Sequence, residues 1–99
     1  TKIRDSVPTK YGASAVVKNS MIADGCVIEG TVENCVLFRG VKIKKGAVVK
    51  NCVLMQNTVL GEHVTMNCMI TDKDVVVRDR RVLSGSENHP FYISKGSMI

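Results

Sequence analysis

A four-residue motif recurs along this 99-residue chain, and this repeat most constrains its fold. Each copy consists of an asparagine, a serine or cysteine and two apolar residues, as in Asn34-Cys35-Val36-Leu37. The leading asparagines are Asn19, Asn34, Asn51 and Asn67, so that successive copies are 15, 17 and 16 positions apart. So short a period is not compatible with paired-helix repeats, and the copies have no leucine-rich signature.

Within each period, short apolar clusters recur about six positions apart. An aliphatic residue follows the end of each motif by six positions: Ile28, Ile43, Leu60 and Val76. Gly, Asn and Asp lie between the clusters, and they tolerate the backbone angles of tight corners. Val and Ile favour strands, and no segment has sustained helical periodicity. The pattern predicts an all-β, single-stranded left-handed parallel β-helix, a hexapeptide-repeat solenoid of about four to five coils.

Stacked coils would place equivalent residues in columns. We expect a structural ladder of Asn19, Asn34, Asn51 and Asn67, with Ser20, Cys35, Cys52 and Cys68 beside it. An asparagine column can form hydrogen bonds along the stack. The uneven spacing predicts one-residue slips at coil corners near residues 32–36 and 54–58. With no C-x-x-C pair present, the four cysteines, Cys26 included, are interpreted as small buried core residues rather than metal ligands.

The two ends differ from the middle of the chain. Residues 1–12 contain Pro8 and no repeat, so they are predicted to be a linker from a preceding domain. Residues 13–99 are predicted to form the solenoid, with an irregular polar cap from about residue 78. The strand pattern returns at residues 91–99, which we expect to cover the open end of the stack, where unpaired strand edges would otherwise associate.

The net charge of +5 comes from the first half, where nine Lys and Arg residues face four Asp and Glu residues. The candidate surface for an anionic effector or partner consists of Arg4, Arg39, Lys42, Lys44 and Lys45. The cluster of Arg78, Arg80 and Arg81 competes for this role, and a solvated face that aids solubility is the alternative. We expect no nucleic-acid partner, because the basic residues are not mixed with aromatic ones. No apolar run has membrane-spanning length, which favours a soluble cytoplasmic protein.

No catalytic, cofactor-binding or metal site is predicted from the residues. The chain has two histidines, one fewer than a zinc site of the carbonic-anhydrase type needs. His63 lies at a corner position in Gly-Glu-His-Val, where a histidine could act as general base of a hexapeptide acyltransferase. Such enzymes often use a protruding loop to form their cleft, and residues 13–77 have no insertion. A stand-alone acyltransferase using His63 therefore remains the alternative function.

Several segments resemble a known enzyme family. The segment from Ile3 to Gly12 resembles the stretch that joins the nucleotidyltransferase domain to the left-handed β-helix in bacterial glucose-1-phosphate adenylyltransferases (ADP-glucose pyrophosphorylases). Leu37-Phe38-Arg39-Gly40-Val41, Asp72-Lys73-Asp74-Val75-Val76 and Gly85-Ser86-Glu87-Asn88 are similar to the C-terminal domain of that family. The best match is the regulatory-type, non-catalytic subunit found in Gram-positive glycogen operons.

The resemblance implies a role in glycogen biosynthesis. The family makes ADP-glucose and pyrophosphate from ATP and glucose 1-phosphate with Mg²⁺, in an N-terminal domain whose Gly-rich loop has no counterpart here. The resemblance therefore implies no catalytic residue and no cofactor in this segment. It implies an assembly and regulatory module that joins a catalytic subunit or self-associates, under the control of a phosphorylated metabolite effector. A scaffold that binds no ligand stays open as well.

Overall fold

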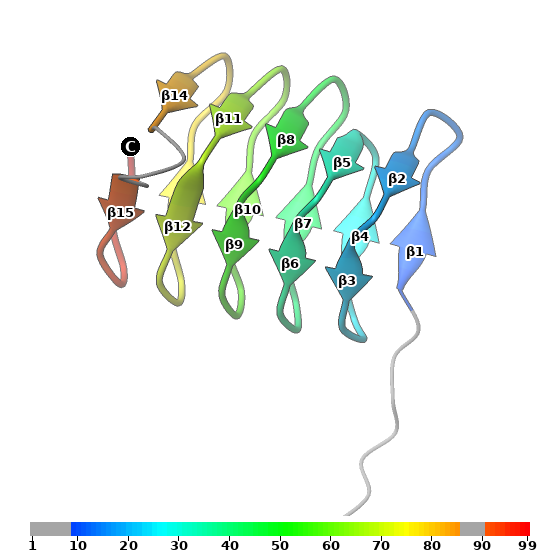
Figure 1. The fold of residues 1–99 in the computed structure, drawn as a ribbon, viewed down its shortest axis with the longest axis horizontal. Helices are drawn as coiled ribbons and strands as arrows, with labels where there is room; N and C mark the ends of the chain where they lie inside the picture. Colours follow the sequence, from blue (N-terminus) through cyan, green and yellow to red (C-terminus); the bar gives the residue numbers. More distant parts are fainter. Residues whose placement is uncertain (1–8, 86–90) are drawn as a thin grey trace, which may run out of the picture.

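The computed structural model describes residues 9–85 and 91–99, which form fifteen short strands and no α-helix (Figure 1). The strands are β1 (Lys10–Tyr11), β2 (Val16–Lys18), β3 (Met21–Ile22), β4 (Val27–Ile28), β5 (Thr31–Glu33), β6 (Val36–Leu37), β7 (Lys42–Ile43), β8 (Val48–Lys50), β9 (Val53–Leu54), β10 (Val59–Leu60), β11 (Thr65–Asn67), β12 (Met69–Thr71), β13 (Val76–Val77), β14 (Val82–Ser84) and β15 (Phe91–Ile93).

These strands form three parallel sheets of five strands each. Sheet A has the order β1-β4-β7-β10-β13, sheet B β14-β11-β8-β5-β2, and sheet C β15-β12-β9-β6-β3. Consecutive strands belong to different sheets, so each coil of the chain adds one strand to each side of a three-sided prism (Figure 1). We number the coils from 1 (β1–β3) to 5 (β13–β15). The predicted hexapeptide-repeat β-helix is confirmed.

The core is a stack of aliphatic layers inside the prism. Ile28, Ile43, Leu60 and Val77 follow one another up sheet A, and all four are buried. Val32, Val49 and Met66 do the same on sheet B, and Leu37 and Leu54 on sheet C. Cys26, Cys35, Cys52 and Cys68 are buried free thiols, as interpreted from the sequence. Burying these side chains is the main favourable contribution to folding.

The corners use the residues that tolerate positive φ. Asn19, Asn34 and Asn51 have φ between 48° and 55° at successive corners between sheets B and C. Asn51 donates a hydrogen bond through Nδ2 to Oδ1 of Asn67, 3.3 Å away. The predicted ladder is wrong in its last step, however, because Asn67 pairs with Lys50 in the strand register. Cys68 has a φ of 56° and occupies the corner position instead, so it is not in the column of Cys52.

The register also corrects the predicted slips. Lys42 pairs with Val59, and Val59 with Val76, so equivalent positions in these coils are 17 apart in the sequence. Val27 pairs with Lys42, only 15 positions later, so coil 2 is shorter. The difference arises at one corner, because only Glu29 and Gly30 separate β4 from β5. The slips expected near residues 32–36 and 54–58 are therefore wrong, and the irregularity is this short corner.

The solenoid extends further at both ends than predicted. Lys10 and Tyr11 pair with β4, so the predicted linker 1–12 is wrong for its last residues; residues 1–8 lie outside the described residues. The cap predicted from residue 78 is wrong as well, because β14 pairs in regular register with β11. In the last stretch β15 pairs with β12 and Met98 bridges to Val76, so residues 91–99 lengthen the stack rather than cover its end.

Gly30 lets the short corner pass close to the next coil. A Cβ at this position would meet the carbonyl oxygen of Ala47, which is backbone and cannot move aside. We expect Gly30→Ala to lower the free energy of unfolding by about 1–3 kcal/mol, the usual range for overpacking. Gly12→Ala is the matched control, since its Cβ would meet mainly the flexible side chain of Glu29. Equal urea midpoints for the two variants would contradict this account.

Substitution of Leu37 tests which side chains of sheet C face the core. It is buried in β6, whereas its neighbour Val36 faces outward and is half-buried. Leu37→Asp would bury an unpaired carboxylate, and we expect it to abolish the cooperative thermal transition, because a domain of this size has only about 5–15 kcal/mol of stability. Val36→Asp should keep that transition. A circular-dichroism melt of Leu37→Asp with an unchanged midpoint would show that the proposed inward position is wrong.

Candidate functional site

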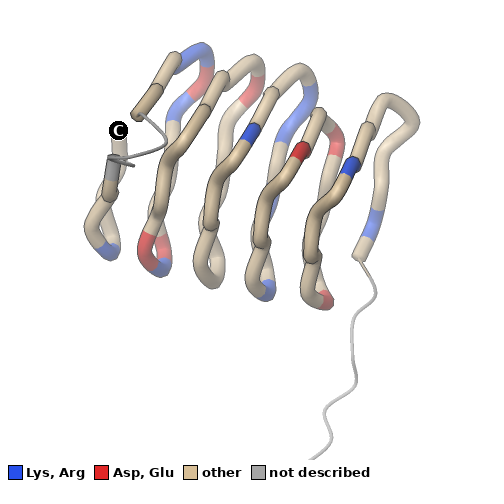
Figure 2. The backbone as a smooth tube through the Cα atoms, viewed as in Figure 1, with Lys and Arg blue, Asp and Glu red and all other residues tan. Residues whose placement is uncertain are grey.

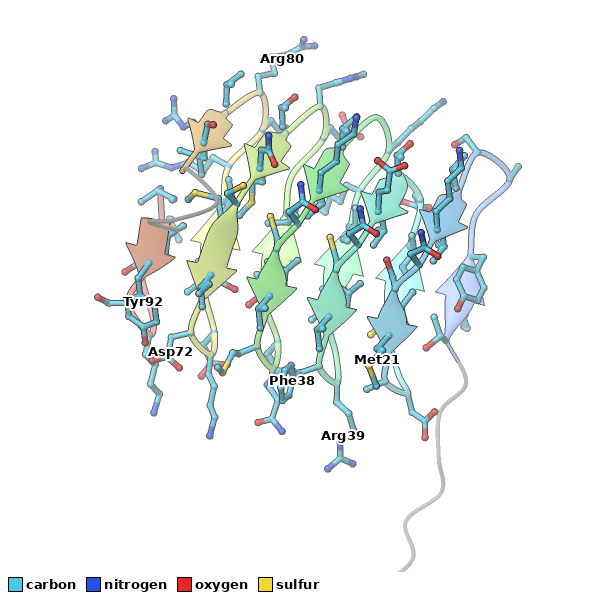
Figure 3. All side chains as sticks on the ribbon, viewed as in Figure 1. Met21, Phe38, Arg39, Asp72, Arg80 and Tyr92 are labelled. Atoms are coloured by element: carbon cyan, nitrogen blue, oxygen red, sulfur yellow. The ribbon has the colours of Figure 1, made fainter. Side chains whose placement is uncertain are left out.

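The outer face of sheet C is an apolar surface that crosses all five coils. Side chains alternate between the two faces of a strand, so one residue of each strand points outward. The register aligns five apolar residues there: Met21, Val36, Val53, Ile70 and Tyr92. Phe38 and Met55, which directly follow β6 and β9 and are exposed or half-buried, continue the surface into the corner. Met21 is 72% exposed, Tyr92 53% and Phe38 38%, so large apolar groups face solvent (Figure 3).

The other two sides of the prism carry charge at their strand positions. Lys18, Glu33 and Lys50 follow one another on sheet B, where the Lys50 ammonium lies 3.8 Å from the Glu33 carboxylate. Lys10 and Lys42 lie on the outer face of sheet A. By contrast, the described strand residues of sheet C include no charged side chain (Figure 2). Apolar surface that a chain leaves exposed in this way marks an interaction site more often than scattered apolar residues do.

The two ends of this face differ: one has an apolar recess, and the other has a hydrogen-bonded tyrosine. Between coils 1 and 2, Met21, Ala23, Val36 and Phe38 surround a shallow apolar recess of about 380 Å³. At coil 5, the Tyr92 hydroxyl donates a 2.6 Å hydrogen bond to Asp72, whose other oxygen accepts one from the backbone N–H of Lys73. The Tyr92 and Lys73 hydrogen bonds hold the pKa of Asp72 below its ordinary value, and the bond from Tyr92 holds its ring at the edge of the face.

A second surface is a basic groove at the corner between sheets A and B. Its volume is about 500 Å³, and it is lined by Lys44, Val59, Gly61, Val76, Val77, Arg78, Asp79 and Arg81. Three cations and one carboxylate thus surround an apolar floor. The carboxylate of Asp79 already accepts a 2.9 Å hydrogen bond from the backbone N–H of Glu62. This arrangement suits an anion that carries an uncharged portion.

The structure separates the basic residues singled out from the sequence. Arg39 lies at the corner between sheets C and A, Lys42 on the outer face of sheet A, and Lys44 and Lys45 at the corner between sheets A and B. Figure 3 shows Arg39 and Arg80 at opposite edges of the solenoid. Arg4 is outside the described residues. These predicted residues therefore do not form a single patch.

Instead, Lys44 joins the cluster that appeared to compete with it. Lys44, Gly61 and Arg78 follow one another every 17 positions, so coil stacking places them in one column. This regular spacing is the sequence signal that could have placed Lys44 and Arg78 in one surface. The apolar face of sheet C was not recognised from the sequence either, although its residues recur at the same spacing in coils 2 to 4.

His63 occupies an exposed corner with a φ of 58°. A side chain on Gly46, one coil earlier, would meet its imidazole ring, so the ring covers that glycine. Within residues 9–85 and 91–99, no carboxylate accepts a hydrogen bond from His63, and no three His, Cys, Asp or Glu residues are grouped as metal ligands. The stand-alone acyltransferase that uses His63 stays a prediction. The described part of the chain also contains no helix long and apolar enough to cross a membrane.

Comparison with known proteins agrees with this architecture. The family described as GlmU-like, C-terminal hexapeptide matches residues 5–96. The chain belongs to this family. Among family relatives, it is 47% identical over 96 residues to the glycogen biosynthesis protein GlgD of Bacillus subtilis (strain 168), an alignment that covers 97% of this chain and 28% of that protein.

Two further relatives support the same placement. The GlgD protein of Geobacillus stearothermophilus is 53% identical over 98 residues, which cover 99% of this chain and 29% of that protein. A glucose-1-phosphate adenylyltransferase of Bacillus cereus (strain ZK / E33L) is 33% identical over 87 residues, which cover 87% of this chain and 23% of the enzyme. The resemblance inferred from the sequence is confirmed. The chain spans less than a third of the length of these relatives.

Proposed function

We propose that this hexapeptide-repeat chain is the assembly and regulatory module of a glycogen-biosynthesis protein of the adenylyltransferase type. The observation that carries the proposal is the apolar outer face of sheet C, which crosses every coil of a rigid prism. The named relatives, a glycogen biosynthesis protein and a glucose-1-phosphate adenylyltransferase, support the pathway. In this role the face joins the module to a catalytic subunit or to a second copy, within the cytoplasm.

The proposal assigns the transfer chemistry to the rest of the parent protein complex. There, ATP and glucose 1-phosphate would give ADP-glucose and pyrophosphate, with Mg²⁺ neutralising the phosphate oxygens. The module itself takes no catalytic part. Its contribution is mechanical. Stacked coils with continuous backbone hydrogen bonds form a stiff body, which holds the domains or subunits attached to it at a fixed separation.

The basic groove gives this module a means of regulation. A phosphorylated metabolite would place its phosphate between Lys44, Arg78 and Arg81, and its carbon skeleton over Val59 and Val76. Arg residues suit this task because the guanidinium presents paired donors to phosphate oxygens. Such a ligand would bridge coil 3 to coil 5 along the corner between sheets A and B.

Deletion of the module tests the proposed function. We expect the full-length parent protein to accelerate pyrophosphate release by its adenylyltransferase partner, and deletion of this segment to abolish that acceleration. The assay mixes the two proteins with ATP and glucose 1-phosphate and compares the rate with that of the partner alone. If the deleted parent accelerates the partner as well as the intact one does, the module is a passive spacer and the proposal fails.

Removal of the groove charges tests the effector site. The triple variant Lys44→Gln, Arg78→Gln, Arg81→Gln should weaken binding of glucose 1-phosphate, measured by calorimetry, by at least about tenfold, because each charge-assisted hydrogen bond contributes about 1.5–3 kcal/mol. The matched control Lys18→Gln, Arg39→Gln, Lys73→Gln removes the same charge away from the groove. Equal losses in both variants would indicate attraction by net charge alone and would contradict a site in the groove.

A further inference from the structure

We propose that Cys35 and Cys52 form a redox site inside the stack, where a small hydroperoxide joins the two thiols as a disulfide between coils 2 and 3. The inference goes beyond the proposed function, which leaves these thiols unused. Both are free and only 1% exposed. Val36 and Val53 of the apolar face directly follow them, so the disulfide would lie just beneath that face and fix the spacing of two of its strands.

The strand register places the two cysteines one above the other. Val36 pairs with Val53, so the residues immediately before them are aligned as well. The backbone N–H of Val36 donates to the carbonyl oxygen of Cys52 across 3.0 Å, which fixes this alignment. Neighbouring strands lie about 4.8 Å apart, and a disulfide joins Cα atoms that are about 4.4–6.8 Å apart. The backbone spacing is therefore within the range that a disulfide spans.

The two side chains also have the same orientation. Each thiol donates a hydrogen bond to the carbonyl oxygen two residues earlier, Cys35 to Glu33 at 3.1 Å and Cys52 to Lys50 at 3.0 Å. The Cys35 thiol also lies 3.4 Å from the carbonyl oxygen of Val49, a residue of coil 3. The Cys35 sulfur is thus already directed toward the coil that contains its partner.

The other two cysteines stack on residues of other types. Cys26 aligns with Val41 in the next coil, because the residues that follow them pair in sheet A. Cys68 takes the corner position that Asn51 has one coil earlier. Among the described residues, the proposed pair is therefore the one place where the register stacks two cysteines in neighbouring coils.

One thiol of the pair suits the role of nucleophile, and the other suits that of proton donor. A hydrogen bond from the Cys52 thiol lowers the pKa of Cys35, whereas the same contact and burial raise the pKa of Cys52. The thiolate is the reactive form of cysteine. Oxidation therefore begins at Cys35.

The reaction takes place in two balanced steps. The Cys35 thiolate attacks one oxygen of hydrogen peroxide, the O–O bond breaks, and a sulfenic acid and one water form. The Cys52 sulfur then attacks the Cys35 sulfur, its proton passes to the departing hydroxyl group, and the S–O bond breaks to release a second water. The two thiols lose two electrons and two protons, and the peroxide becomes two waters. A dithiol reductant restores both thiols.

Burial selects a small oxidant. Each cysteine directly follows an exposed corner asparagine, Asn34 or Asn51, so each lies one residue from the surface along the chain. Local opening of a corner admits a hydroperoxide before it admits a bulky disulfide. The site would therefore respond to peroxide, and the bond that it forms would report oxidising conditions.

Treatment of the chain with hydrogen peroxide tests the site. The chain is then denatured, and its free thiols are alkylated and counted by mass spectrometry. We expect two of the four thiols to be lost, with Cys35 joined to Cys52 in the peptide map. Cys35→Ser should keep all three of its thiols, and serine fits this column because Ser20 donates there to Lys18 at 2.8 Å. Cys26→Ser is the matched control and should still lose two thiols.

A second readout is thermal stability, because the disulfide closes a loop of one full coil. The circular-dichroism midpoint of the oxidised chain should rise by about 5 °C or more and return with dithiothreitol. Four free thiols after peroxide treatment overturn the proposal, and so does a bond between two chains or equal thiol loss in Cys35→Ser. A joined pair without the rise contradicts a disulfide that fits the native stack. If Cys35→Ser loses the β-helix, Cys52→Ser replaces it, and the wild-type peptide map decides by itself.

Discussion

Backbone hydrogen bonding between successive coils is the constraint on which the rest of this structure depends. The N–H of Lys42 donates to Thr58 across 2.9 Å, and that of Val59 donates to Val75 across the same distance. Each such bond fixes one coil against the next, so a residue has a defined neighbour in the following coil. The alternation of side chains along short strands then decides which column is buried and which is exposed. The apolar face and the basic groove are both columns of this kind.

The interior places strict demands on residue type because the coils are so narrow. Thr58 and Thr71 show this well, since both are buried at positions where aliphatic residues stand in other coils. Their hydroxyls lie 3.1 Å apart, and Thr58 also donates to the carbonyl oxygen of Met55 at 2.9 Å. A buried hydroxyl without a hydrogen-bond partner would be costly, and these two hydroxyls bond to each other between neighbouring coils.

The sequence predicted the architecture but not its register. The six-residue apolar pattern was sufficient for the β-helix, because it reports which residues face inward. The register depends on exact coil length, and the motif copies are misleading there: Asn67 resembles Asn51 in its local sequence, yet Cys68 takes its place in the stack. The short corner at Gly30 is equally hard to recognise, since a shortened turn leaves the apolar pattern on either side intact.

The same reasoning explains why the functional surfaces were less predictable than the fold. Lys44 and Arg78 are far apart in the sequence, and only a known coil length brings them to one groove, two coils apart in the stack. Closeness in the sequence instead grouped Arg39 with Lys44. The strand β7 lies between these two residues and places them at different corners of the prism. Charge density along a sequence is therefore a poor guide in a solenoid, where neighbours in space are one coil apart.

Both surfaces depend on coil 5, which gives them a physical basis for coupling. Among the described strands, β14 and β15 each have a partner on one side only, so this coil has fewer strand neighbours than those in the middle of the stack. Terminal repeats of this kind open most easily. An anion held by Arg78 and a subunit packed on Tyr92 would each stabilise the same coil. By linkage, whichever binds first lowers the ordering cost for the other, so the groove would strengthen assembly without touching sheet C.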